Sequence, residues 1–235
     1  MKNRFYGDKK DYFKYGLLNI LSSRYDSIGI NWYLTDDNHG HPGHGNDTGY
    51  LDQDNWRHYN SQIFDKLKRR VISRQRNIKY CRIDNLVSNL KYEAIEKLPD
   101  NANDREYERR RKEWHSRALD DLAKTDLIFF DPDKGVRENL IPGPIHGSEH
   151  AKASEIYDYN WCDWLVIQFL QPRRNRFEQL IGNPIFTNSQ QRKKIVAFIS
   201  GPVAFLYVTW CIDLILLQQV FKAWDTKIST QILLA

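Results

Sequence analysis

Cysteine is scarce in this 235-residue sequence: Cys81, Cys162 and Cys211 are the only three, and they lie far apart. An odd number with no CxxC pair provides neither a disulfide framework nor a cysteine-based metal pair. Such usage is typical of a reducing compartment. Residues 1–16 also lack the uninterrupted apolar segment that a signal peptide needs. We therefore expect a cytoplasmic protein.

Apolar segments long enough to cross a membrane are lacking as well. The most apolar stretch, residues 195–221, is cut by Gly201-Pro202 and contains Asp213. The pieces on either side are shorter than the ~20 apolar residues that span a bilayer. We interpret them as two buried strands and a helix, and we expect no membrane partner.

Internal repeats, low-complexity tracts and clear linkers are absent, so we expect residues 1–235 to form a single domain. Hydrophobic residues make up 41% and charged residues 28%, which is the balance of a globular protein rather than a disordered one. The net charge of +5 is compatible with an anionic partner. The basic segments 69–76 and 173–176 could contact nucleic-acid phosphates, or they could simply be solvated faces.

What the chain does contain is a succession of helical and extended segments. Apolar residues at helical spacing predict helices over residues 11–24, 63–71, 101–122, 174–182 and 212–224. Apolar segments rich in β-branched and aromatic residues predict strands over residues 28–34, 77–84, 126–131, 161–170, 193–200, 204–210 and 228–235. This alternation implies an α/β fold, in which helices cover both faces of a mostly parallel sheet with an antiparallel edge. Trp114, Ala118 and Leu122 are expected to face the core.

Polar residues follow three of the predicted strands. They are Thr35-Asp36-Asp37, Asp84-Asn85 and Asp131-Pro132-Asp133-Lys134. Each group could be a surface turn, because Asp, Asn and Pro are ordinary turn residues. The carboxyl ends of neighbouring parallel strands share one edge of a sheet, where open α/β sheets bind their ligands. We therefore expect the three groups to form one site.

A loop rich in histidine and glycine follows the first predicted strand. His39, His41 and His44 alternate there with Gly40, Gly43 and Gly45. Imidazoles beside carboxylates could bind a divalent metal. The glycines could instead hold a phosphate or carboxylate through backbone N–H groups. A surface loop with incidental histidines is the third interpretation, and the sequence leaves all three open.

The segment before the first strand is dense in charged and aromatic side chains. Asp8 or Asp11 could cap the helix that begins there by accepting hydrogen bonds from its free N–H groups. Tyr12, Lys14 and Tyr15 follow on the first turns and could contact an anionic or aromatic ligand.

Three segments, "GDKKDYFKYGLLNIL", "INWYLTDD" and "LIFFDPDKG", carry a resemblance. They resemble a group of uncharacterised bacterial and phage proteins with the motifs GDxxDxxKYxLL and FxDPDxG. More distantly, the order of elements is similar to that of the adenine-N6 methyltransferases acting on large-subunit ribosomal RNA and of the three-Cys-motif partner proteins. The resemblance implies a Rossmann-like, methyltransferase-type sheet.

The resemblance also implies roles for particular residues. Gly7, Asp11 and Lys14 match the helix motif of the ribosomal enzymes, with Tyr15 in place of a histidine. S-adenosylmethionine is the implied cofactor, and RNA or DNA is the implied partner. The residues implied on the cofactor side are Lys14, Tyr15, Asp36, Asp37, Gly40 and Asp84. The residues implied in catalysis are Asp131, Pro132, Asp133 and Lys134. The ribosomal enzymes have a catalytic tetrapeptide of an acidic residue, two prolines and an aromatic residue. Asp133 and Lys134 occupy the positions of its second proline and its aromatic residue.

Three hypotheses for the function follow. The first is a methyltransferase-like protein that acts on or binds nucleic acid, with Asp131 contacting the target amine. The second is a metal-dependent nuclease or phosphodiesterase, with Asp131, Asp133 and Asp36 or Asp37 as Mg²⁺ ligands and Lys134 offsetting phosphate charge. The third is a binding module that kept the fold and lost the chemistry.

Overall fold

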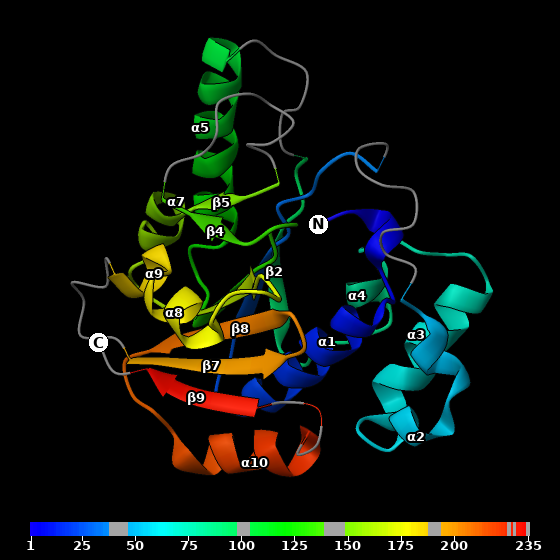
Figure 1. Cartoon of the computed structure of the whole chain (residues 1–235). Helices are drawn as coiled ribbons and strands as arrows, with labels where there is room; N and C mark the ends of the chain where they lie inside the picture. The colour runs from blue at the N-terminus through cyan, green and yellow to red at the C-terminus, as the bar shows by residue number, and fades with distance from the viewer. Residues whose placement is uncertain are drawn as a thin grey trace.

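A seven-stranded sheet forms the centre of the molecule (Figure 1). The computed structural model describes residues 1–37, 47–97, 104–138, 149–187, 194–224, 227 and 229–233. In sheet order the strands are β2 (Leu90–Ala94), β1 (Ile28–Asn31), β3 (Leu127–Phe130), β6 (Asp163–Phe169), β8 (Val203–Thr209), β7 (Lys194–Ser200) and β9 (Ser229–Leu233). A separate parallel pair is formed by β4 (Val136–Arg137) and β5 (Ala151–Lys152).

Strand direction divides this sheet into two parts. Strands β2, β1, β3 and β6 are mutually parallel, while β8 is antiparallel to both of its neighbours and β9 is antiparallel to β7. Five of the seven strands, including β7, therefore run in one direction. The expected α/β fold with a mostly parallel sheet and antiparallel strands at one end is confirmed.

Helices cover both faces of the sheet, as expected. Adjacent side chains of a strand point to opposite faces, and all four residues of β3 are buried, so both faces are packed. One face packs against α1 (Lys9–Leu21) and α10 (Leu214–Trp224), and α3 (Ser61–Ile72) packs against α1. The other packs against α5 (Asp104–Asp121), α7 (Ala153–Tyr157), α8 (Arg176–Ile181) and α9 (Pro184–Thr187). Trp114, Ala118 and Leu122 are buried in the second layer, which confirms that expectation.

The remaining helices are short. They are the α-helices α2 (Asp54–Arg57) and α4 (Tyr80–Ile83) and the 3₁₀ helices η1 (Asn3–Phe5) and η2 (Gly49–Asp52). Within the described ranges, no helix has both the length and the apolar composition needed to cross a bilayer.

The predicted strand over residues 77–84 is wrong. Residues 80–83 form the single helical turn α4, and the strand beside β1 is Leu90–Ala94. The Asn77 side chain accepts a hydrogen bond from the backbone of Lys79 at 3.0 Å, which begins a turn. Asn85 and Asn89 both adopt positive φ, at 47° and 59°, and redirect the chain into β2. Asp84 therefore follows a helix rather than a strand.

Strand β1 is also shorter than the predicted 28–34. It ends at Asn31, and Tyr33 adopts a positive φ of 44°, which breaks the extended conformation. Leu34 still forms an isolated parallel bridge with Lys97, so the chain continues along the same edge of the sheet.

Candidate functional site

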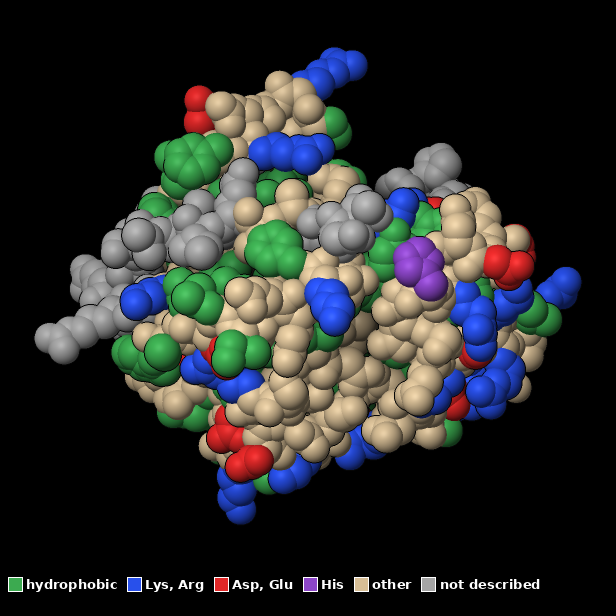
Figure 2. All heavy atoms as spheres, turned by 90° about the horizontal axis from the view of Figure 1, so that it is seen from below, with side chains coloured by type: hydrophobic (Ala, Val, Ile, Leu, Met, Phe, Trp, Pro, Cys, Tyr) green, Lys and Arg blue, Asp and Glu red, His purple; other side chains and the backbone are tan. Residues whose placement is uncertain are grey.

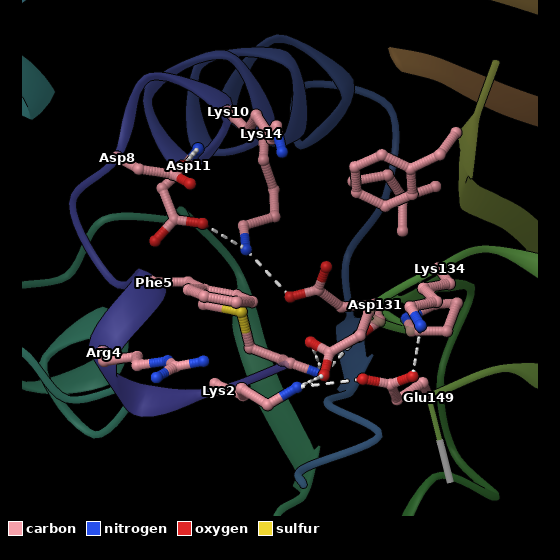
Figure 3. A pocket seen from close by; sticks show the side chains of 15 residues that line it. Lys2, Arg4, Phe5, Asp8, Lys10, Asp11, Lys14, Asp131, Lys134 and Glu149 are labelled. Atoms are coloured by element: carbon pink, nitrogen blue, oxygen red, sulfur yellow. Dashed lines mark hydrogen bonds and ion pairs between the residues drawn. The ribbon is translucent and has the colours of Figure 1, made fainter. Parts of the chain in front are cut away.

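A cavity of about 360 Å³ lies at the carboxyl end of β3 (Figure 3). The four residues after this strand, Asp131 to Lys134, line it together with Ile167 and Phe169 of β6. The remaining lining residues come from the start of the chain and the loop before β5: Met1, Lys2, Arg4, Phe5, Asp8, Lys10, Asp11, Lys14 and Glu149. Segments distant in sequence therefore meet where the buried strand ends.

The residues of the amino-terminal motif form one hydrogen-bonded unit. Gly7 has a φ of 84°, and its N–H donates to Asp11 Oδ2 at 2.9 Å. Asp8 caps α1 by accepting a hydrogen bond from the Asp11 backbone at 3.0 Å. Lys14 Nζ pairs with Asp11 Oδ1 at 2.6 Å and with Asp131 Oδ2 at 2.8 Å. The motif thus fixes α1 to the end of β3 through one buried lysine.

In this cluster the carboxyl groups outnumber the ammonium groups: Lys14 lies among Asp8, Asp11 and Asp131. Burial lowers the pKa of Lys14, but Asp11 and Asp131 outweigh it and the pKa is raised, so the lysine stays protonated. Burial raises the pKa of Asp131 by more than Lys14 lowers it, with Asp11 adding repulsion. Burial and the adjacent Asp11 raise the pKa of Asp8 to about 7. The cluster can therefore take up a proton near neutral pH.

Asp133 has a different environment from Asp131. Its carboxylate pairs with the Met1 amino group at 2.9 Å and with Lys2 Nζ at 2.6 Å, and it accepts a hydrogen bond from Thr35 Oγ1 at 2.7 Å. Burial alone would raise its pKa, but these two cations outweigh that effect and lower it to about 2. Asp133 is therefore ionised and held by two cations and one hydroxyl group.

A sharp turn directs the chain away from the site after Asp133. Gly135 has a φ of 88°, and a Cβ there would lie 2.5 Å from Gln168 Oε1. The same Gln168 oxygen accepts a hydrogen bond from the Val136 N–H at 2.8 Å, which fastens the turn to β6. Lys134 pairs with Glu149 Oε2 at 2.5 Å, both residues line the cavity, and the Lys134 side chain is half exposed (Figure 3).

The other predicted site residues lie in different surroundings. Asp36 pairs with Lys97 at 2.5 Å and Asp37 accepts a hydrogen bond from the Arg4 backbone at 3.2 Å. Both follow Thr35, whose bond to Asp133 brings the ends of β1 and β3 together. Asp36, Asp37 and Asp84 do not line the cavity. Arg70 holds Asp84 by two hydrogen bonds of 2.6 and 2.8 Å.

The remaining predicted residues are Tyr15 and those of the histidine loop. Tyr15 is fully buried beneath Lys14, whose Nζ lies 5.1 Å from the centre of its ring. The Tyr15 hydroxyl has no hydrogen-bond partner among the described residues. Gly40 and the three histidines His39, His41 and His44 lie outside the described residues.

Several lining residues were not predicted from the sequence. Lys2 and Glu149 are 147 positions apart in the sequence, yet Lys2 Nζ lies 3.4 Å from Glu149 Oε1. Phe169, at the end of β6, provides an apolar wall, and Lys10 Nζ lies 4.7 Å from the centre of its ring. The sequence signals for these residues are slight: a basic and aromatic start to the chain, and an aromatic residue at the end of an apolar strand.

Within the described part of the chain, the carboxylates at this edge are not arranged as the ligands of a metal ion. Among the residues that the structure describes, no group of three or more His, Cys, Asp or Glu side chains could hold a metal ion. Asp131 and Asp133, the Mg²⁺ ligands of the nuclease hypothesis, are paired instead with ammonium groups. Comparison of the chain with known protein families, curated proteins and solved structures gives no match.

Proposed function

We propose that this chain is a methyltransferase-like protein that binds S-adenosylmethionine in the cavity beside Asp131 and acts on or binds nucleic acid. The observation that carries this proposal is the position of the cavity. From β1 the chain passes to β2 on one side and then to β3 on the other, so the strand order reverses between β1 and β3. The cavity lies next to this switch point, beyond the carboxyl ends of β3 and β6, and open α/β sheets bind their ligands outside the carboxyl ends of their strands.

The arrangement of the last strands supports a methyltransferase-type sheet. The β7–β8 hairpin places antiparallel β8 between β6 and β7, at the end of the parallel part of the sheet. The helix α10 and the strand β9 follow, in the order expected from the resemblance. Because one fold hosts many chemistries, the activity itself rests on the cavity and its residues.

The cavity residues fit the chemical groups of S-adenosylmethionine. Lys10 would pair with the carboxylate of its methionyl part, and Asp8 would accept from the amino group of that part. Phe5 and Phe169 would form the apolar walls. When bound, this cofactor supplies an electrophilic methyl group. Asp131 Oδ2 already accepts from Lys14, so Oδ1 would be the acceptor for the amine of a target base.

Cations beside the cavity support a nucleic-acid partner. Lys10 also lines a second hollow of about 320 Å³, together with Lys9, Trp56 and Lys227. Phe169 also lines a third hollow, together with the exposed Arg173 and Arg174. Three adjoining hollows with cations at both ends and aromatic side chains between them are suited to a single-stranded nucleic acid.

Isothermal titration calorimetry with S-adenosylmethionine and with its demethylated product tests the cofactor assignment. We expect both compounds to bind, and we expect Lys10→Ala to weaken binding about tenfold or more, the cost of a missing charge-assisted hydrogen bond. Lys112→Ala, an exposed lysine on α5, is the matched control. No heat with either compound at high micromolar protein would contradict the assignment.

A non-catalytic binding module is the second candidate, because Asp131 is held by Lys14 and the residues after Pro132 are Asp133 and Lys134. Transfer of a labelled methyl group to RNA or DNA separates the two candidates. Transfer that disappears in Asp131→Asn supports an enzyme. Cofactor binding without transfer to either nucleic acid supports the module. The ion pairs of Asp131 and Asp133 give no support to the nuclease hypothesis.

A further inference from the structure

The second hollow, of about 320 Å³, brings together cations from positions far apart in the sequence. Its lining comes from the start of α1, from α2, from the turn that joins β7 to β8 and from the segment after α10. Lys9 and Lys10 belong to α1, and Lys227 follows α10. Asp47 is the one carboxylate among the described residues that line it. The lining therefore carries more positive than negative charge.

The indole ring of Trp56 holds two of these cations close to each other. Lys9 Nζ lies 5.3 Å and Lys227 Nζ lies 4.6 Å from the centre of the ring. The two nitrogen atoms are thus no farther apart than the sum of these distances. The ring is held in place, because Phe13 packs edge-on against it and its Nε1 donates to Gln53 Oε1 at 3.2 Å. Two ammonium groups over one ring in a hollow attract an anion more strongly than either would alone.

Acidic side chains neutralise these cations only in part. Asp47 Oδ2 lies 3.6 Å from Lys9 Nζ, which is beyond hydrogen-bond distance, and the Asp47 side chain is 58% exposed. An exposed ion pair of this length is weak. Among the residues that the structure describes, no carboxylate pairs with Lys227. An anion that enters the hollow would therefore meet cations that are not already saturated.

The surface next to the hollow is basic as well. Figure 2 views the molecule from the side of α10, and Lys and Arg side chains gather at its right, where α2 and α3 lie in Figure 1. Helix α3 carries Lys66, Lys68, Arg69 and Arg70. A nucleic-acid strand that approaches the hollow from this side would meet positive charge.

We propose that the second hollow binds a phosphate monoester, the group at the end of a nucleic-acid strand or on a free nucleotide. A monoester carries close to two negative charges at neutral pH, whereas each internal phosphate of a strand carries one. Three lysines beside one aspartate match the dianion better than the diester. The Ser200 hydroxyl can donate a further hydrogen bond, and Pro202 and Phe205 offer an apolar surface to the sugar or base. Binding of a strand end rests on the proposed function, namely its nucleic-acid partner, but not on the cofactor.

Two matched comparisons test this site. Fluorescence anisotropy compares internally labelled single strands of one sequence that carry a 5′ phosphate, a 3′ phosphate or hydroxyl groups at both ends. Calorimetry compares thymidine monophosphate with thymidine. We expect a phosphorylated ligand to bind at least tenfold more tightly than its hydroxyl counterpart. A preference among the strands assigns the phosphate to a strand end, and a preference in calorimetry alone assigns it to a free nucleotide.

The outcomes separate this site from the proposed nucleic-acid partner. If all the strands bind equally and neither thymidine compound binds, the phosphate site is overturned while the nucleic-acid partner stands. If no strand binds and thymidine monophosphate does, the nucleic-acid partner fails and the phosphate site stands. If nothing binds, both fail.

Substitutions at the Trp56 ring locate the phosphate. Lys9→Gln and Lys227→Gln together should remove the preference for the phosphorylated ligand, because they take both cations from the ring. Lys227→Arg keeps the charge and should retain the preference. Lys112→Gln with Lys124→Gln removes the same charge from exposed positions elsewhere and should leave the preference unchanged. A preference that survives in the Lys9→Gln and Lys227→Gln double variant would overturn the assignment to this hollow.

Discussion

Lys14 is the side chain on which the contact between α1 and the end of β3 depends. It is 2% exposed and pairs with Asp11 and Asp131, both also buried. A buried ion pair adds little net stability relative to apolar residues, but removing one partner leaves an uncompensated charge in the interior. The role of Lys14 is therefore to hold Asp131 in one position while remaining protonated.

We expect Lys14→Met to lower the free energy of unfolding by about 3–5 kcal/mol, because it leaves Asp11 and Asp131 without their counter-ion. Urea denaturation monitored by tryptophan fluorescence measures the change. Lys10→Met is the control: this lysine lines the same cavity without joining the ion pairs of Asp11 and Asp131, and its replacement should cost less than about 1 kcal/mol. Equal destabilisation of the two variants would contradict the role given to Lys14.

Asp8 gives the site a pH dependence. Its pKa of about 7 lies above the ordinary value of 3.8, so the native state holds a proton that the unfolded chain has released. This contribution to stability is fully present below pH 3.8 and is lost as the pH rises towards 7. We expect the wild type to lose stability from pH 5 to pH 8, and Asp8→Asn, which keeps a capping oxygen, to lose less. Urea denaturation at several pH values measures both slopes, and parallel slopes would refute the prediction.

Gly16 allows α1 and α10 to pack closely, because it has no Cβ between the two helices. A Cβ on Gly16 would lie 2.3 Å from the Trp224 ring. We expect Gly16→Ala to cost about 1–3 kcal/mol through overpacking and to lower the melting temperature by several degrees. Gly49→Ala is the control, because nothing lies within 4 Å of the Cβ it would add. A melting temperature unchanged by Gly16→Ala would show that α10 can move away from α1 without cost.

Most helices and strands were predictable because their apolar pattern is strong. Residues 127–130 and 203–209 are buried throughout, and buried strands have an unmistakable composition. Strand β2 was missed because it lies at the edge of the sheet, where Ala94 is its one fully buried residue. A strand was predicted over residues 77–84 instead because this segment contains two β-branched isoleucines and β2 contains no β-branched residue, although residues 80–83 form a helical turn.

The candidate site was predictable in part for a similar reason. Asp131 and Asp133 end a buried strand, and that boundary is visible in the sequence. Their partners are not, because Lys14 and Lys2 are 117 and 131 positions away. A charged residue whose partner is distant in the sequence resembles any solvated surface residue, so such pairs become evident only once the chain is folded.

Across the whole molecule, positive charge is placed on both sides of the cavity. Replacing Arg173 and Arg174 together by glutamate should weaken binding of a labelled single-stranded oligonucleotide at least tenfold. The slope of log affinity against log salt should fall in magnitude by about 1.4, or ~0.7 for each phosphate that is no longer neutralised. Fluorescence anisotropy measures both quantities. Lys112→Glu with Lys124→Glu makes the same charge change on exposed lysines elsewhere and should have a smaller effect.

Lys14 and Gly16 are two residues apart and face opposite sides of α1, one against Asp131 and the other against Trp224 of α10. A displacement of α1 therefore reaches both contacts at once. A ligand that holds the cavity in one arrangement therefore also restrains the contact between α1 and α10.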